Sequence, residues 1–228
     1  MTTTTLIPTI QASPAEVYDI ELEHSLLEAN AKLAAANRSM LDRYGVEAID
    51  FMGAIGSGKT TLITRLAEKL KPNFGIVILN GDATTTDFNL AASRGVPVVQ
   101  IATVNGCHLD ANLVGKALQR VDLAETGLIF IENIGNLICP AEFPLGSRSR
   151  IVVVSVTEGP YMVRKHPHMF RGADLVVINK IDLADAMGVS VEQLVCDVQM
   201  LKPGLSVIPT NCRTGDGIEA VAEAILAM

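Results

Sequence analysis

The pattern of apolar and polar positions divides the chain into a long first helix and a region in which short apolar runs alternate with helical patterns. Ser13, Pro14 and Glu16 have the spacing of a helix start, and Gly45 suits a helix end. The pattern therefore predicts a helix that continues to about Tyr44. Its packing stripe, facing the domain surface or another chain, is predicted to be Leu22, Leu26, Ala29, Leu33, Asn37 and Met40.

Seven short apolar runs follow, and most of them do not alternate with polar residues. Such runs are typical of strands buried on both faces of a parallel sheet. The predicted strands are 49–52, 75–79, 96–101, 128–131, 151–156, 175–178 and 206–208. The predicted helices lie near 59–71, 87–94, 110–121, 162–171, 190–201 and 216–227. We expect an α/β fold with a doubly wound, mostly parallel sheet over residues 45–228, preceded by a disordered start and the N-terminal helix over residues 1–44.

Composition supports this fold and narrows the function. Apolar residues make up 49% of the 228, enough for a large core. The net charge of −7 argues against nucleic acid as a partner, because binding a phosphate backbone requires a basic face. The sequence shows neither a long apolar run typical of a membrane span nor the pattern of a signal peptide. Four separated cysteines without a C-x-x-C pair suit free thiols in a reducing compartment, so we expect a cytoplasmic protein.

A glycine-rich segment after the first predicted strand has the motif G-x-x-x-x-G-K-[ST] of a phosphate-binding loop, or P-loop. An apolar run precedes it and an amphipathic helix follows, so backbone N–H groups and the helix N-terminus can surround a phosphate. Lys59 is expected to reach the β- and γ-phosphates, and the Thr60 hydroxyl to bind Mg²⁺. The alternative to a P-loop is a glycine-rich turn that contains a lysine by chance. Such a turn would not require a strand before it and a helix after it. The expected nucleotide contacts are Gly53, Ala54, Ile55, Gly56, Ser57, Gly58, Lys59, Thr60 and Thr61.

Two acidic residues stand at the ends of later strands. Glu132 ends the run LIFIE, and Asp82 follows GIVILNG. Because the carboxyl ends of parallel strands meet at the ligand crevice, both carboxylates should lie near Mg²⁺ or the attacking water. We therefore predict Lys59, Asp82 and Glu132 as catalytic groups, with Thr60, Asp82 and Glu132 as magnesium ligands. The alternative for each acid is a solvated strand end.

The motif N-K-x-D follows the predicted strand DLVVI and points to guanine. The Asp182 carboxylate can accept hydrogen bonds from both N1–H and the N2 amine of guanine, donors that adenine lacks. Lys180 can lie over the ring, and Asn179 completes the motif. A loop after the last strand, with Cys212 and Arg213, stands where GTPases direct backbone N–H groups to the base. The sequence therefore predicts a GTPase; a small-molecule kinase would have no use for a guanine site.

Three residues are candidate ligands for a softer metal ion. Cys107 and His108 open a predicted helix, and Cys139 lies beyond Glu132 on the same segment. On residue types alone, packing explains two cysteines and one histidine better than a metal site does. His166 and His168 also have ligand-like spacing, although Pro167 between them suits the start of a helix. Cys196 is expected in the core.

The segments GAIGSGKTTL, CHLDA, FIENIGNLICP, VTEG and NKIDLADA, in this order, resemble the HypB family of GTPases for nickel insertion in [NiFe]-hydrogenase maturation, and its short archaeal-type members above all. The resemblance covers roughly residues 25–228 and implies a SIMIBI-type GTPase, cytosolic and forming a homodimer promoted by GTP. It implies Ni²⁺ or Zn²⁺ at the dimer interface, bound by Cys107, His108 and Cys139, and places Asp82 and Glu132 in the magnesium and switch apparatus. The implied partners are a nickel-delivery protein and the hydrogenase large subunit.

Two features depart from the family pattern. The sequence lacks the Cys-rich and His-rich nickel motifs of bacterial members, so we do not expect metal storage by this chain. The segment after Asp82 carries Thr84, Thr85 and Thr86 where a more apolar switch is expected, although Asp87 could still pair with Lys180 of a partner subunit. Two alternatives stay open: a urease-type or other metallocentre-maturation GTPase, although the Cys-Pro-His motif of the urease sibling is absent, and a nucleotide-switched metal-binding module with negligible hydrolysis.

Overall fold

A seven-stranded sheet forms the centre of the protein, as a computed structural model of the chain shows. The structure describes residues 14–81, 95–102 and 108–228, with side chains described from residue 25 onward. All strand pairs are parallel, and the strand order is β3-β2-β4-β1-β5-β6-β7. The strands are β1 (Glu47–Met52), β2 (Ile76–Asn80), β3 (Val98–Gln100), β4 (Leu128–Glu132), β5 (Ser149–Ser155), β6 (Leu175–Asn179) and β7 (Ser206–Pro209). Each matches a predicted strand, so the doubly wound parallel sheet is confirmed.

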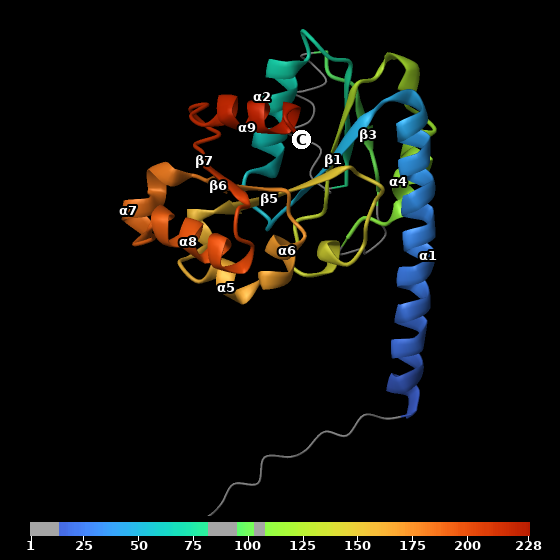
Figure 1. Cartoon of the computed structure of the whole chain (residues 1–228), viewed down its shortest axis with the longest axis horizontal. Coiled ribbons are helices and arrows are strands. Elements are labelled where there is room, and N and C mark those ends of the chain that lie inside the picture. Colours follow the sequence, from blue (N-terminus) through green and yellow to red (C-terminus); the bar gives the residue numbers. More distant parts are fainter. Residues whose placement is uncertain (1–13, 82–94, 103–107) are drawn as a thin grey trace, which may run out of the picture.

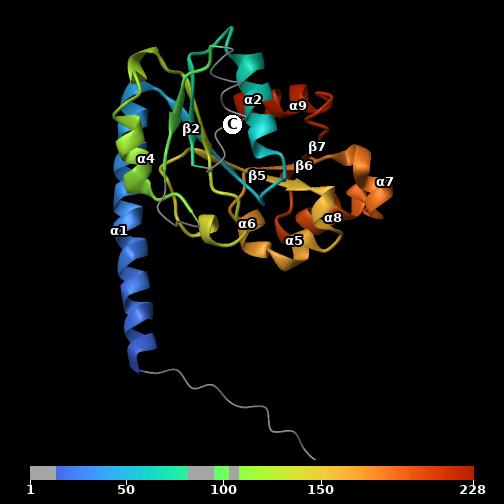
Figure 2. The same ribbon diagram turned by 180° about the vertical axis from the view of Figure 1, so that it is seen from behind.

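Helices cover both faces of the sheet (Figures 1 and 2). They are α1 (Pro14–Tyr44), α2 (Lys59–Leu70), α4 (Ala111–Leu118), α5 (Met162–Lys165), α6 (Pro167–Arg171), α7 (Ala184–Met187), α8 (Val191–Leu201) and α9 (Ile218–Leu226). The single helix predicted over 162–171 is wrong: it breaks into α5 and α6 at His166, because a residue before proline avoids the helical conformation. The short helix α7 was not predicted. The helix predicted over 87–94 lies outside the described residues.

Three apolar clusters fill the space between the sheet and the helices. One lies under α2 and α9 and contains Phe51 and Phe130, whose rings meet edge to face with centroids 5.4 Å apart. The other two lie on the opposite face, one under α5, α6 and α8 and the other under α1 and α4. In β1 the alternation of side chains places Ile49 and Phe51 on the first face and Ala48 and Met52 on the second. Asp50, between them in sequence, therefore lies on the second face, where the two clusters meet.

Helix α1 packs along a stripe that is rotated from the predicted one and shares with it Asn37 and the partly buried Met40. Leu26 and Leu33 of the predicted stripe are 59% and 43% exposed. The buried residues are Asn30, Ala34, Asn37 and Leu41. The asparagine amides decide the orientation because they make hydrogen bonds to buried main chain. Asn37 Nδ2 donates to the carbonyls of Ala111 and Leu145 at 2.7 and 3.0 Å, while Asn30 Oδ1 accepts from Ala111 N at 2.8 Å. A hydrophobic pattern cannot reveal a packing face held by amides.

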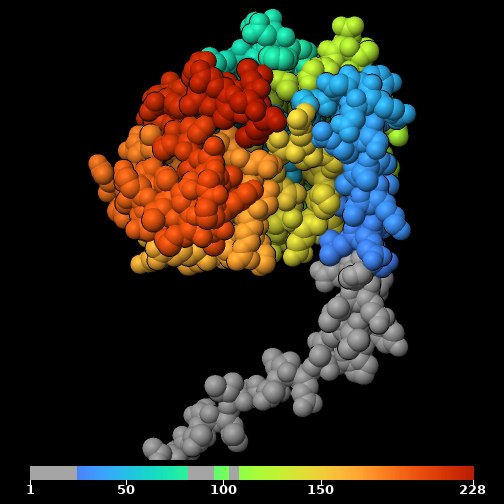
Figure 3. All heavy atoms as spheres, in the orientation of Figure 1, coloured from blue at the N-terminus to red at the C-terminus, as the bar shows by residue number. Residues whose placement is uncertain are grey.

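Helix α1 and the C-terminal elements lie on opposite flanks of the molecule. In Figure 3 α1 lies along one side, and the elements from β6 to α9 make up the other. Gly45 ends α1 in the left-handed conformation expected of a helix terminus, with φ of 67°.

Cys196 was expected in the core, but the structure places it at the exposed surface of α8.

Candidate nucleotide and metal site

The glycine-rich loop joins β1 to α2, at the carboxyl edge of the sheet. Gly53 and Gly58 have φ of 149° and 101°, which side-chain-bearing residues rarely adopt. An added Cβ would lie 2.0 Å from Val153 O at Gly53 and 2.1 Å from Asn179 Nδ2 at Gly58. Both glycines are therefore required by close contacts, and the loop that they shape leads into the N-terminus of α2, where backbone N–H groups can bind a phosphate.

Lys59 and Thr60 begin α2 and turn inward. Lys59 is buried, and its ammonium donates to the carbonyls of Gly53 and Ala54 at 3.2 and 3.0 Å. The Thr60 hydroxyl donates to Glu132 Oε1 at 2.7 Å, which brings two of the predicted magnesium ligands together. Both supply the oxygen atoms that Mg²⁺ prefers, so their chemistry fits that ion.

The third predicted magnesium ligand, Asp82, lies outside the described residues. Gly81, immediately before it, donates its N–H to Glu132 O at 2.9 Å, so β2 ends beside Glu132. Thr84, Thr85, Thr86 and Asp87 also lie outside the described part of the chain.

The predicted base-binding residues line one pocket of about 340 Å³, large enough for part of a nucleotide. Asp182 faces Arg213, with 3.5 Å between Oδ2 and the guanidinium. Lys180 has a φ of 62° and donates to Gly56 O at 2.6 Å. The lining is Gly58, Thr61, Asn179, Lys180, Asp182, Leu183, Asn211, Cys212 and Arg213. Sequence reasoning did not single out Leu183, which adjoins Asp182, whereas Asn211 belongs to the loop that it placed at the base.

Asn179 joins the phosphate and base ends of this pocket. Its amide is buried and donates to Ser57 O at 2.8 Å, and its Oδ1 accepts from Cys212 N at 3.0 Å. The next two backbone N–H groups of the loop, at Arg213 and Thr214, donate to a side-chain oxygen within the loop. The loop is thus ordered by its own bonds, with Asn179 as its link to the P-loop.

Glu158, in the VTEG segment, is an acidic neighbour of the phosphate end that the residue-by-residue reasoning did not single out. Its Oε1 accepts from Ser155 N at 2.8 Å. Burial raises the pKa of this carboxyl, while the positive charges of Lys59 and Lys180 act in the opposite direction. The only sequence signal for it was its place in VTEG after a buried strand.

His108 lies against the segment that carries Cys139. Its imidazole stacks on Phe143, with ring centroids 3.7 Å apart and an interplanar angle of 23°. Burial lowers the pKa of His108, and the nearby Asp110 carboxylate only partly opposes this. The lowered pKa favours the neutral ring, which is the form that binds metal ions.

Cys139 begins a short 3₁₀ turn, Cys139–Ala141, and its thiol is free and half-buried. The third candidate ligand, Cys107, lies outside the described residues. Within residues 25–81, 95–102 and 108–228, His, Cys, Asp and Glu side chains form no group of three that could hold a metal ion. His166 and His168 flank the start of α6 and belong to no such group.

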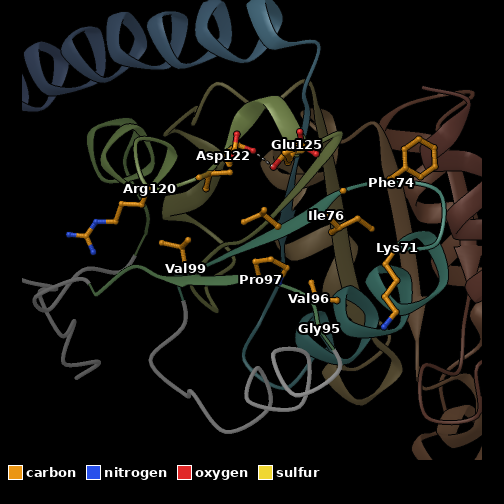
Figure 4. A pocket seen from close by; sticks show the side chains of 14 residues that line it. Lys71, Phe74, Ile76, Gly95, Val96, Pro97, Val99, Arg120, Asp122 and Glu125 are labelled. Atoms are coloured by element: carbon orange, nitrogen blue, oxygen red, sulfur yellow. Dashed lines mark hydrogen bonds between the residues drawn. The ribbon is translucent and has the colours of Figure 1, made fainter.

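A larger cavity, of about 490 Å³, lies at the opposite edge of the sheet. Figure 4 shows residues from the amino ends of β2 and β3 lining it, including Ile76 and Val99, together with Lys71 beyond α2 and Asp122 after α4. The P-loop is at the carboxyl edge, so this cavity is separate from the nucleotide pocket. None of the helices in the described parts of the chain is both long and apolar enough to cross a membrane.

The phosphate loop and the N-K-x-D strand end share one pocket, and this combination assigns the chain to the P-loop domains of GTPase type. More narrowly, the chain belongs to the HypB family. Residues 48–209 match the family described as CobW/HypB/UreG, nucleotide-binding domain. The chain is 46% identical over 207 residues to a probable hydrogenase maturation factor HypB of Methanocaldococcus jannaschii, covering 90% of this chain and 94% of that one.

Solved structures agree with this assignment. Hydrogenase maturation factor HypB of Archaeoglobus fulgidus superposes with a TM-score of 0.84 at 40% identity, covering 88% of this chain and 98% of that one. HypB of Helicobacter pylori, solved in complex with nickel, gives 0.82 at 32% identity, covering 87% and 94%. The chain spans 66% of the length of the Azotobacter vinelandii HypB, to which it is 41% identical.

Proposed function

We propose that this protein binds GTP with Mg²⁺, hydrolyses it to GDP and phosphate, and uses the nucleotide state to control a bound nickel or zinc ion in hydrogenase maturation. The observation that carries the proposal is the single pocket in which Asp182, Lys180 and Thr61 meet Gly58 of the P-loop. Relatives are hydrogenase maturation factors, and one was solved with nickel, which supports the metal part.

Nucleotide binding would exchange three internal contacts for contacts with the ligand. Lys59 would leave two loop carbonyls for phosphate oxygens, and Asp182 would leave Arg213 for the guanine N–H groups. Thr60 would keep its hydrogen bond to Glu132 and offer a lone pair of the same hydroxyl oxygen to Mg²⁺. Each group is already within its site, so little rearrangement is needed. Phosphoryl transfer depends mainly on such positioning and charge stabilisation.

Mg²⁺ would be held by Thr60, Glu132 and Asp82, and when bound it would neutralise charge on the phosphates. In this site Lys59 orients and partly neutralises the phosphates. Glu132 is buried and accepts the Thr60 hydroxyl, so it also fixes the rotamer of that side chain.

The metal cargo would be bound by Cys107, His108 and Cys139. Thiolate and imidazole suit both Ni²⁺ and Zn²⁺, and square-planar or tetrahedral geometry would distinguish them. A closed site needs about four ligands, so a homodimer that supplies the set twice around one ion is the natural arrangement. We further propose that the dimer is promoted by GTP, acts in the cytoplasm and exchanges metal with a nickel-delivery protein and the hydrogenase large subunit.

Nucleotide choice is tested with Asp182→Asn. The variant should bind xanthine nucleotide in preference to guanine nucleotide, because an amide can donate to the O2 atom that replaces the N2 amine. Binding of fluorescent GDP, XDP and ADP analogues measures this exchange of preference. Tight binding of ADP or ATP by the unaltered protein would contradict the guanine assignment.

The metal role is tested by titrating Ni²⁺ with and without a non-hydrolysable GTP analogue while light scattering follows the mass. By linkage, if GTP favours a dimer that binds metal, the metal must favour the GTP-bound dimer to the same extent. Wild type should show this dependence, and Cys107→Ala and His108→Ala should lose it. If neither the Ni²⁺ affinity nor the mass changes with nucleotide or with substitution, the metal role is excluded and the GTPase role is unaffected. Phosphate release by the full chain separates a hydrolysing enzyme from a nucleotide-switched binding module.

A further inference from the structure

A buried polar network connects the two segments that carry His108 and Cys139. Its centre is Asp50 in β1, a fully buried carboxylate. Asp50 Oδ1 accepts from Asn133 Nδ2 at 3.1 Å, and Asp50 Oδ2 lies 3.6 Å from Arg150 Nε. None of these three side chains belongs to the predicted nucleotide or metal ligands.

The order of the strands brings the network together. Asp50 and Arg150 are register partners on β1 and β5, and Asn133 follows β4 on the other side of β1. Alternate residues of a strand share one face, so all three are directed to the face away from α2. The network therefore fills the boundary between the two apolar clusters on that face.

One arm of the network reaches the His108 segment. Asn133 Oδ1 accepts from the backbone N–H of Leu109 at 3.2 Å, and Leu109 directly follows His108. The same oxygen accepts from Ile134 N at 3.0 Å. The oxygen of the Asn133 amide thus holds the Leu109 backbone, while its nitrogen donates to Asp50.

The other arm reaches the Cys139 segment. Arg150 Nη1 donates to Ala141 O at 3.3 Å, and Ala141 ends the turn that begins at Cys139. Two residues later Phe143 stacks on the His108 ring, so the two segments also touch each other. The arms and the stacked rings form a closed path through Asp50.

The network also meets the nucleotide side at the end of β4. Glu132 and Asn133 are adjacent, so their side chains point to opposite faces of the sheet. Glu132 accepts the Thr60 hydroxyl on the α2 side, and Asn133 donates to Asp50 on the other. A displacement of this strand end by nucleotide would therefore be passed directly to the backbone beside His108.

We propose that Asp50, Asn133 and Arg150 are positioning residues that fix the His108 and Cys139 segments relative to each other for metal binding and couple their arrangement to the nucleotide. This inference rests on the proposed metal role of His108 and Cys139. Residues that orient metal ligands from behind typically change affinity by about 10–100-fold when removed.

The test compares Asp50→Asn and Asn133→Ala with a matched control, Asp197→Asn, in the full chain. Asp197 is another buried aspartate paired with an arginine, since Arg164 donates to both of its oxygens at 2.8 Å, but that pair joins α5 to α8. Ni²⁺ affinity is measured by competition with a chromophoric chelator, with GDP and with a non-hydrolysable GTP analogue. The thiolate-to-nickel absorption band reports ligand geometry, and thermal unfolding reports stability.

Asp50→Asn and Asn133→Ala should weaken Ni²⁺ binding roughly tenfold or more, shift the absorption band and reduce the difference between the two nucleotides. GDP affinity without metal should stay close to that of wild type. Asp197→Asn should lower the unfolding temperature and leave Ni²⁺ binding unchanged. If Asp50→Asn does not fold, Asn133→Ala carries the test alone, because it leaves the Asp50–Arg150 pair in place.

The inference would be overturned if the network variants bind Ni²⁺ as tightly as wild type and with the same dependence on nucleotide. It would also be overturned if Asp197→Asn weakens Ni²⁺ binding to the same extent as they do. The proposed function fails differently. If His108→Ala and Cys139→Ala bind nickel as wild type does, the metal site itself is misplaced, and the positioning role falls with it.

Discussion

Replacing Asp50 with asparagine should change how the stability of the protein depends on pH. Burial raises the pKa of Asp50 to about 6, against the attraction of Arg150 and the hydrogen bond from Asn133, which lower it. In the unfolded chain the same carboxyl ionises near 3.8. Between these values the folded protein holds a proton that the unfolded chain has released, so stability falls as pH rises from about 4 to about 6.

The size of this effect follows from the two pKa values. A difference of one in pKa is worth about 1.4 kcal/mol, so complete titration of Asp50 is worth about 3 kcal/mol, and about 2 kcal/mol of this loss falls between pH 4 and pH 6. Asparagine does not titrate, so Asp50→Asn lacks this loss. Relative to wild type, the variant should therefore gain about 2 kcal/mol between pH 4 and pH 7, whatever its stability at either pH.

Urea unfolding followed by circular dichroism at pH 4, 5, 6 and 7 measures the free energy of unfolding of both proteins. The comparison cancels every other titrating group, because those groups are common to both. Parallel curves would show that Asp50 is ionised as easily inside the protein as outside. A variant that loses stability relative to wild type as pH rises would reverse the sign and refute the assignment of burial as the dominant cause.

Three further substitutions test the fold and the pocket. Gly58→Ala should weaken GDP binding about tenfold or more, measured by fluorescence titration, because the required φ is strained and the new Cβ would meet Asn179 Nδ2. Asn37→Ala should cost about 1–3 kcal/mol in urea unfolding, because it leaves two buried carbonyls without their donor; an unchanged midpoint would mean that α1 is not held there. Phe51→Ala should cost about 3–5 kcal/mol through the cavity beside Phe130, whereas Phe51→Leu should cost far less.

The sheet could be predicted because its strands are apolar runs with little alternation, bounded by turn residues. The nucleotide site could be predicted because its chemistry requires particular residues at fixed spacing, as in Gly58-Lys59-Thr60. Thr60 was assigned to Mg²⁺ from the P-loop motif and Glu132 from its place at a strand end, and in the structure the Thr60 hydroxyl lies 2.7 Å from Glu132 Oε1.

What the sequence could not reveal depends on buried polar groups. Asn37 was placed on the predicted packing stripe of α1, but Asn30 was not, because an asparagine does not extend an apolar stripe; both hold the helix through hydrogen bonds to buried main chain. Asp50 interrupts the apolar run of β1, and nothing nearby in sequence indicates its partners 83 and 100 residues away. Such contacts become visible only when strand order and register are known.

The contact of Gly58 with Asn179 predicts that substitutions in different parts of this protein affect nucleotide binding in different ways. It fastens the P-loop, β6 and the loop after β7 into one block, so the base-reading side of the pocket cannot move independently of the phosphate side. Reorganisation on nucleotide exchange is then confined to the other side, where β2 and β4 end. Variants between β6 and α9 should alter the affinity for the nucleotide. Variants around the end of β4 should instead alter how the nucleotide state changes the conformation of the rest of the protein.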